Sequence, residues 1–435
     1  MLKSINGHIY SSKNHHFKYL TVIGLVSFFL LYGCSSVRRT VNGQLRDKSL
    51  KNSFHGLVVM NPKTGKTVYN FNGEAYFTPA SNVKIVTFYS ALKLLPKNIP
   101  AVTYAVSNDT LFVEGTGDPS WLHPYLQDST AIQWLKKQGT IALYLQNFRE
   151  DRYGPGWAWE DYDAYFSPER SPLPLYGNVV TISYTDSLNV SPVFFRGNVS
   201  LKDTIRHRDE FSNRFYIEPT SQDTLEVPFL TSDGLTKRLL ETVLEKEIVL
   251  SDHFPNADKR TLYGMESDSI YKHMLLESDN FLAEQLLLTA SSTLSDTLGT
   301  QKTIARMLDT DLKDLEQQPR WVDGSGLSRY NLFTPKSLVQ VLQKLYAEIP
   351  EERLFKIFPM WDASGTVEKW KDPTIEPFIF AKSGSLGNNY NLSGYLKTKS
   401  GKLLIFSFMN NHFKIPTSQI RNTIYTTLQE IYETY

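Results

Sequence analysis

Three short motifs with reactive side chains follow one another along the chain: Ser81-Asn-Val-Lys84, Ser278-Asp-Asn280 and Lys382-Ser-Gly384. A serine hydroxyl becomes an effective nucleophile when a neighbouring base takes its proton, and a lysine amine can be that base when its surroundings favour the neutral form. An asparagine amide donates and accepts hydrogen bonds at once, which suits a substrate amide. Together the motifs predict a centre that transfers an acyl group from a peptide-like substrate to a serine.

The residues around Ser81 favour it as the nucleophile. It follows Phe77-Thr-Pro-Ala80 and precedes apolar residues with helical spacing, which end at Pro96. This pattern predicts a buried helix that begins at Ser81. The apolar positions are Ile85, Phe88, Tyr89, Leu92 and Leu95. Lys84 then lies one turn after Ser81, on the same helical face.

Similar patterns occur elsewhere, but their contexts argue against them. Ser269–Lys272 repeats the first motif without such a helix entry. Lys63-Thr-Gly65 and Lys399-Ser-Gly401 repeat the third motif between two apolar runs, where turns are expected. Lys382 instead continues the strand-like run Phe378–Ala381.

The single cysteine of the chain, Cys34, directly follows an apolar stretch at residues 19–32. Lysines precede this stretch, and it is short for a membrane span, so we interpret residues 1–34 as a signal peptide. The sequence Leu31-Tyr-Gly-Cys34 resembles the bacterial lipobox, which predicts that Cys34 is lipidated and anchors the protein to a membrane. An ordinary cleavage site or an uncleaved anchor is the alternative. Residues 35–52 are polar and are expected to form a tether.

Bulk composition narrows the functional class. The chain has 435 residues, 41% of them hydrophobic and 21% charged, which is enough for two or three folded domains. A formal net charge of +1 gives no general attraction to nucleic acid. The nine histidines are scattered and no H-E-x-x-H motif occurs, so neither a metal centre nor another cofactor is predicted. A lone cysteine provides no disulfide framework.

The predicted elements place the motifs in one discontinuous domain. Residues 54–71 predict a hairpin, and helical spacing at 270–276 and 281–288 puts the second motif at a helix–helix junction. Between the first two motifs the pattern is long and mostly strand-like. We therefore expect a catalytic domain at residues 53–99 and 255–435, with a strand-rich accessory domain inserted at residues 100–254.

Segments around and between the motifs carry a family pattern. They are Pro79–Lys84, Gly115–Pro119, Gly154–Asp161, Glu277–Glu284, Asp323–Arg329 and Ala381–Leu386. These segments resemble the D-alanyl-D-alanine carboxypeptidase/endopeptidases of the class C low-molecular-mass penicillin-binding proteins. The resemblance implies an α+β fold with a β-lactamase-like catalytic domain, in which helices flank an antiparallel sheet. It implies a serine enzyme that acts on peptidoglycan stem peptides as a D-Ala-D-Ala carboxypeptidase, as an endopeptidase on cross-bridges, or as both, and that β-lactam antibiotics inhibit covalently.

Residue roles follow from the motifs and the resemblance. Ser81 is expected to be the nucleophile and Lys84 its base, while Ser278 relays the proton to the leaving amine and Asn280 binds the substrate amide. Lys382 and Ser383 are expected to hold the terminal carboxylate. The resemblance implies an oxyanion hole made by the backbone N–H groups of Ser81 and Ser385, with Gly384 as a further substrate-binding residue of this strand.

Asp161 and Arg329 are expected to read the third residue of the stem peptide, because both fall in segments that match family positions implicated in this role. In the cell wall that the family and lipobox resemblances imply, that residue is diaminopimelate, whose side chain ends in an ammonium and a carboxylate. One acid and one guanidinium would suit both groups. Otherwise Asp161 caps its loop and Arg329 forms a surface ion pair of little energetic weight.

Two other functions remain open from the sequence. A β-lactamase needs fast deacylation, which a glutamate in an E-x-x-L-N loop supports, and the chain has no such loop. A non-catalytic cell-wall-binding lipoprotein would not need the intact motif residues. An α/β-hydrolase is disfavoured because Gly324-Ser-Gly326 lacks the G-x-S-x-G spacing. The predicted location is the periplasmic side of the cell envelope.

Overall fold

The computed structural model describes residues 41–43, 45, 50–221, 223–361, 365–367 and 377–435. The predicted signal peptide and Cys34 lie outside these residues. Within the described part of the chain, no helix is both long and apolar enough to span a membrane.

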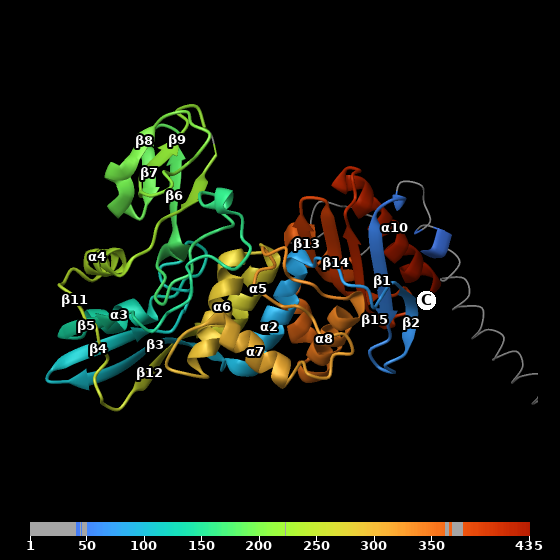
Figure 1. Ribbon diagram of the computed structural model, residues 1–435, viewed down its shortest axis with the longest axis horizontal. Helices are drawn as coiled ribbons and strands as arrows, with labels where there is room; N and C mark the ends of the chain where they lie inside the picture. Colours follow the sequence, from blue (N-terminus) through green and yellow to red (C-terminus); the bar gives the residue numbers. More distant parts are fainter. Residues whose placement is uncertain (1–40, 44, 46–49, 222, 362–364, 368–376) are drawn as a thin grey trace, which may run out of the picture.

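A five-stranded antiparallel sheet forms the centre of one half of the molecule, in strand order β13-β14-β15-β1-β2 (Figure 1). The strands are β1 (Phe54–Met60), β2 (Thr67–Phe71), β13 (Ile379–Leu386), β14 (Asn389–Lys397) and β15 (Leu403–Asn411). Side chains alternate across a sheet: Leu57 and Val59 pack in the cluster with helix α10 (Thr417–Thr434), and Val58 packs in the cluster on the other face. The sheet is therefore covered on both faces.

Six helices build the layer on the face opposite α10. They are α2 (Val83–Leu94), α5 (Ser267–Leu276), α6 (Asn280–Ser292), α7 (Thr300–Asp309), α8 (Pro335–Glu348) and α9 (Glu351–Ile357). Helix α2 packs against α5, α6 and α8, so every side chain from Val83 to Ala91 is buried. This surrounding explains why its sequence is largely apolar on all sides. The predicted buried helix after Ser81 is confirmed.

A second five-stranded sheet lies in the insert, in strand order β11-β5-β4-β3-β12. Its strands are β3 (Asn98–Ser107), β4 (Thr110–Gly115), β5 (Thr140–Tyr144), β11 (Val249–Leu250) and β12 (Arg260–Glu266), and helices α3 (Thr130–Lys136) and α4 (Asp233–Leu244) accompany it. Because β12 pairs with β3, this sheet continues past the boundary expected at residue 255.

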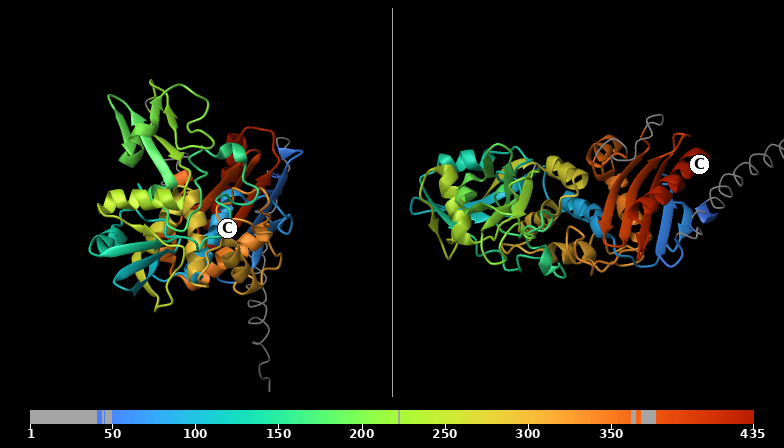
Figure 2. Two further views of the ribbon diagram at one scale, coloured as in Figure 1. Left: turned by 60° about the vertical axis from the view of Figure 1, so that its left-hand side comes forward. Right: turned by 90° about the horizontal axis from the view of Figure 1, so that it is seen from above.

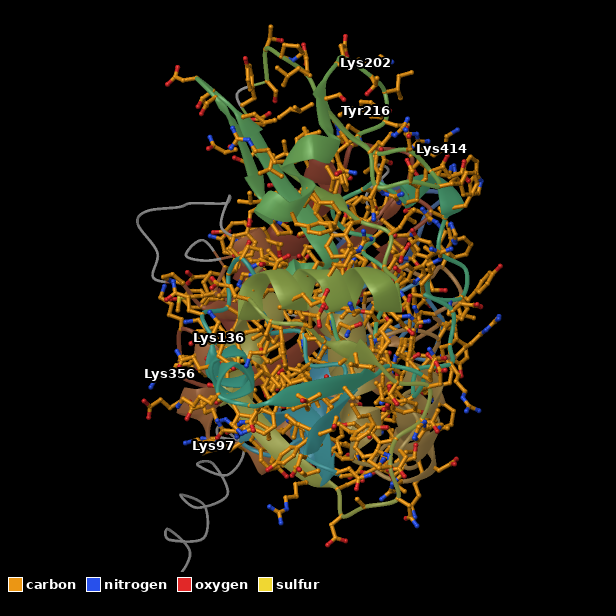
Figure 3. All side chains as sticks on the ribbon, turned by 90° about the vertical axis from the view of Figure 1, so that its left-hand side faces the viewer. Lys97, Lys136, Lys202, Tyr216, Lys356 and Lys414 are labelled. Atoms are coloured by element: carbon orange, nitrogen blue, oxygen red, sulfur yellow. The ribbon has the colours of Figure 1, made fainter. Side chains whose placement is uncertain are left out.

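Smaller strands extend the insert into a projecting lobe (Figure 2). They are β6 (Val179–Tyr184), β7 (Leu188–Ser191), β8 (Val199–Leu201), β9 (Phe215–Ile217) and β10 (Leu225–Pro228). One apolar cluster runs from the five-stranded sheet into this lobe. At the lobe surface the Lys202 ammonium lies 5.8 Å from the centre of the Tyr216 ring (Figure 3). The α+β fold class predicted from the sequence is confirmed.

Candidate active site

Ser81 lies in a short 3₁₀ helix, η2 (Ala80–Asn82), that leads directly into α2. The preceding residue, Ala80, has a φ of 49°, a left-handed conformation that costs an ordinary residue about 1–2 kcal/mol. The Lys84 ammonium donates a hydrogen bond of 2.9 Å to Ser81 Oγ. The helical spacing therefore brings the Ser81 hydroxyl and the Lys84 amine into contact, and their roles as nucleophile and base stay a prediction.

The second motif forms the junction between α5 and α6, and each of its residues has a structural task. Ser278 has a φ of 57°, and the next N–H, of Asp279, returns to the carbonyl of Met274 at 3.1 Å. This is the left-handed turn that commonly ends a helix. Asp279 then caps α6 by accepting a hydrogen bond from Leu282 N at 2.9 Å. Asn280 is the first residue of α6, and the predicted junction is confirmed.

Lys84 is fully buried and has three hydrogen-bond acceptors. Besides Ser81 Oγ, they are Asn280 Oδ1 at 2.6 Å and the Ser325 carbonyl oxygen at 2.7 Å. Burial lowers the Lys84 pKa to about 8, although the negative charges of Asp279, Asp323 and Glu284 oppose this shift. A base that is partly neutral near neutral pH is what proton abstraction from serine requires.

The third motif lies on β13, beside Ser81. A Cβ at Gly384 would come within 2.6 Å of the Pro79 carbonyl oxygen and 2.9 Å of Ser81 N, so only glycine permits this close approach. The Ser383 hydroxyl is 2.7 Å from Thr366 Oγ1. Lys382 is fully buried and donates a hydrogen bond of 2.8 Å to the Ser383 carbonyl oxygen. Burial and the charge of Lys84 lower the Lys382 pKa well below its usual range.

A cavity of about 940 Å³ opens above these residues. Its catalytic side is lined by Ser81, Ser278, Asn280, Ser383 and Ser385. The insert supplies the facing wall with His123, Tyr125, Tyr165, Phe166 and Glu226. Asn280 Nδ2 also donates to the Phe166 carbonyl oxygen at 2.8 Å, so the second motif contacts the insert directly. Among the described residues, no group of three or more His, Cys, Asp or Glu side chains could hold a metal ion.

Asp161 and Arg329 make none of the hydrogen bonds described above for the three motifs. Asp161 belongs to the 3₁₀ helix η3 (Trp159–Asp161), where burial raises its pKa. Arg329 Nη1 lies 3.4 Å from the Gly387 carbonyl oxygen, and Gly387 lines the cavity. Neither Asp161 nor Arg329 is among the described residues that line the cavity, and no ion pair joins them there.

Several buried polar residues that support the site had no role assigned from the sequence. Asp323 accepts hydrogen bonds from Gly326 N at 2.9 Å and Ser328 N at 2.6 Å, which fixes the loop before α8. Glu284 accepts from Ser325 N at 2.7 Å. Its position in the sequence could have indicated a place near the site, because Glu284 follows Asn280 by one helical turn and so lies on the same face of α6.

The overall fold is that of a penicillin-binding protein. Over 90% of this chain and 98% of the other, it resembles the crystal structure of penicillin binding protein 4 (dacB) from Haemophilus influenzae, with a TM-score of 0.70 and 19% identity. The chain belongs to the D-Ala-D-Ala carboxypeptidase 3 (S13) family, which it matches over residues 37–201 and 230–431. The family predicted from the sequence motifs is therefore confirmed.

Individual relatives are distant but cover most of the chain. The D-alanyl-D-alanine carboxypeptidase DacB of Haemophilus influenzae is 23% identical over 85% of this chain and 88% of its own length. The penicillin-sensitive carboxypeptidase A of Dictyostelium discoideum is 23% identical over 78% of each chain.

Proposed function

We propose that this protein is a penicillin-sensitive serine D-Ala-D-Ala carboxypeptidase, with endopeptidase activity on cross-bridges, that acts on peptidoglycan through a Ser81 acyl-enzyme. The observation that carries the proposal is the buried Lys84 ammonium, hydrogen-bonded to both Ser81 Oγ and Asn280 Oδ1, two residues that line the cavity. Membership of the S13 family and the carboxypeptidase names of the relatives support the substrate class.

The geometry supports a two-step reaction. Neutral Lys84 takes the Ser81 proton as Oγ attacks the carbonyl carbon of the scissile bond, and the backbone N–H groups of Ser81 and Ser385 stabilise the oxyanion. The carbon–nitrogen bond then breaks as the proton that Lys84 took passes through the Ser278 hydroxyl to the leaving amine. Lys84, neutral again, takes a proton from the water that attacks the acyl-serine ester, and this proton returns to Ser81 Oγ as the ester bond breaks. The Ser383 hydroxyl at the cavity wall hydrogen-bonds to the terminal carboxylate. The negative charge of this carboxylate favours the ammonium form of the neighbouring Lys382, which burial and Lys84 otherwise disfavour.

Labelling with a fluorescent penicillin tests the nucleophile. Wild type and Ser269→Ala should be labelled, because Ser269 belongs only to the repeated pattern in α5. Ser81→Ala and Lys84→Ala should not, because one lacks the nucleophile and the other its base. Labelling that persists in Ser81→Ala would refute the assignment.

Incubation with defined muropeptides, followed by mass spectrometry, tests the substrate. Release of D-alanine and cleavage of cross-linked dimers are the expected products. Rapid turnover of nitrocefin without cleavage of either muropeptide would instead indicate a β-lactamase. A protein that is neither labelled by penicillin nor active on muropeptides would be a binding lipoprotein.

We further propose that Asp161 and Arg329 select diaminopimelate at the third position of the stem peptide. The position of Arg329 beside the cavity residue Gly387 supports a contact with a long substrate side chain. The test compares kcat/KM on pentapeptides that contain diaminopimelate or lysine. Asp161→Ala should lose most of the preference and keep penicillin acylation, since penicillin lacks that side chain. Equal losses on both peptides would show that Asp161 is structural.

The lipid anchor is a separate proposal, supported by the lone Cys34 directly after the apolar stretch at residues 19–32. Palmitate labelling should disappear in Cys34→Ala, and the protein should leave the membrane fraction, because two or more acyl chains anchor stably whereas one is marginal. Unchanged fractionation, together with a tryptic peptide spanning residues 30–40, would contradict it.

A further inference from the structure

A buried chain of hydrogen bonds connects the catalytic lysine to a carboxylate outside the cavity. Glu284 on α6 is 1% exposed, and its Oε1 accepts a hydrogen bond of 2.7 Å from Ser325 N. The carbonyl oxygen of the same residue, Ser325, accepts the 2.7 Å hydrogen bond from Lys84 Nζ. The backbone of Ser325 therefore lies between Glu284 and Lys84.

The loop that carries Ser325 fits tightly around the nucleophile. A Cβ at Gly326 would lie 1.9 Å from the Ala80 carbonyl oxygen, and Gly326 has a φ of 84°. The Gly324 carbonyl oxygen accepts a hydrogen bond of 2.6 Å from Thr87 Oγ1 of α2. A displacement of Ser325 would therefore move the acceptor of Lys84 and press on the segment before Ser81.

The second oxygen of Glu284 makes the carboxylate unusual. Glu284 Oε2 has no hydrogen-bond partner among the described residues, and its nearest cation is Arg170 Nη1 of the insert at 3.9 Å. Arg170 is itself held by Thr300 Oγ1 at 2.9 Å and the Asp151 carbonyl oxygen at 2.7 Å. A buried acid with an unsatisfied oxygen costs stability, which makes Glu284 a candidate for a role beyond packing.

We propose that Glu284 is a positioning residue that orients the lone pair of Lys84 through Ser325 and sets the protonation state of this lysine. The inference rests on the proposed function of Lys84 as the base. As an ammonium, Lys84 has one proton for each of its acceptors, Ser81, Asn280 and Ser325. As an amine it keeps the N–H groups on Asn280 and Ser325, so its lone pair points at the Ser81 hydroxyl.

The charges around Lys84 and Glu284 decide in which direction loss of the Glu284 charge shifts the Lys84 pKa. Asp279 and Asp323 also favour the ammonium form of Lys84, and Lys84 in turn opposes the charged form of Lys382. Glu284 faces Asp323 and Arg170, and burial raises its pKa to about 7. Removal of the Glu284 charge should lower the pKa of Lys84.

Glu284→Gln and Glu284→Asp separate charge from position. Glutamine keeps the acceptor for Ser325 N and removes the charge. The acid limb of the pH–rate profile, in which the rate constant for penicillin acylation rises as Lys84 loses its proton, should therefore move to lower pH by about 0.5 unit or more. Aspartate keeps the charge but is too short to reach Ser325 N, so the plateau rate should fall about tenfold or more with the limb in place. The rate constant is the second-order value, measured by labelling from about pH 6 to about pH 10.

Asp118→Asn is the matched control, because Asp118 is also buried with a pKa raised to about 7 but does not act on Lys84. Its acid limb should coincide with that of wild type. A Glu284→Gln limb that coincides with wild type would refute the proposal. If Glu284→Gln does not fold, an unchanged plateau in Glu284→Asp refutes it instead. Absence of acylation in wild type would overturn the proposed function itself.

Discussion

The burial of Lys84 predicts how steeply acylation depends on pH. With a pKa of about 8, Lys84 is neutral in about one tenth of molecules at pH 7 and about one hundredth at pH 6. An exposed lysine with its usual pKa would be neutral in only about one molecule in 3,000 at pH 7. Burial thus raises the concentration of the active base roughly 300-fold at pH 7.

The sign follows from the role of the amine. Only the neutral form accepts the Ser81 proton, so the second-order rate constant for penicillin acylation should rise roughly tenfold from pH 6 to pH 7 and level off above about pH 8. Timed labelling with a fluorescent penicillin, quantified on gels at each pH, measures this profile. Circular dichroism at the same pH values checks that the protein stays folded.

A profile that is flat from about pH 6 to about pH 9 in folded protein would refute the reasoning, because no titrating base would then limit acylation. A rate that falls as pH rises would reverse the sign and indicate that the ammonium form is the active one.

Three further substitutions test how the site is held. Gly326→Ala should lower the acylation rate about tenfold or more, because its Cβ would meet the Ala80 carbonyl oxygen at 1.9 Å; an unchanged rate would contradict the tight loop. Thr87→Val removes a buried hydrogen bond of 2.6 Å to the Gly324 carbonyl oxygen and should lower the free energy of unfolding by about 1–3 kcal/mol in urea titrations. Leu286→Ala, at a fully buried position of α6, should lower it by about 2–5 kcal/mol while folded protein still reacts with penicillin; a loss under about 1 kcal/mol would show that the core relaxes around the cavity.

Local geometry made part of the site predictable from the sequence. Ser81 and Lys84 are one helical turn apart, so their contact follows from the helix alone. The junction at Ser278 was readable because two apolar helical patterns meet there. Both inferences need only a few neighbouring residues.

Long-range packing explains what the sequence did not reveal. The link from Glu284 through Ser325 to Lys84 joins three segments that only the folded chain brings together. The full burial of Lys382 likewise depends on what covers β13. The sequence of β12 alone does not show to which sheet the strand belongs, because this depends on its pairing with β3.

The pairing of β1 with β15 has a consequence for how the protein is made. Phe54 lies opposite Asn411, so the sheet cannot close until the chain has been synthesised through β15. The entropy cost of closing such a long loop is paid before these contacts stabilise it. The insert has its own apolar cluster and can fold before the strands of the first sheet, which flank it in the sequence, have paired. A nascent or truncated chain that lacks β15 should therefore carry Ser81 and Lys84 without an assembled site, which delays the appearance of hydrolytic activity until β15 has been synthesised and has paired with β1.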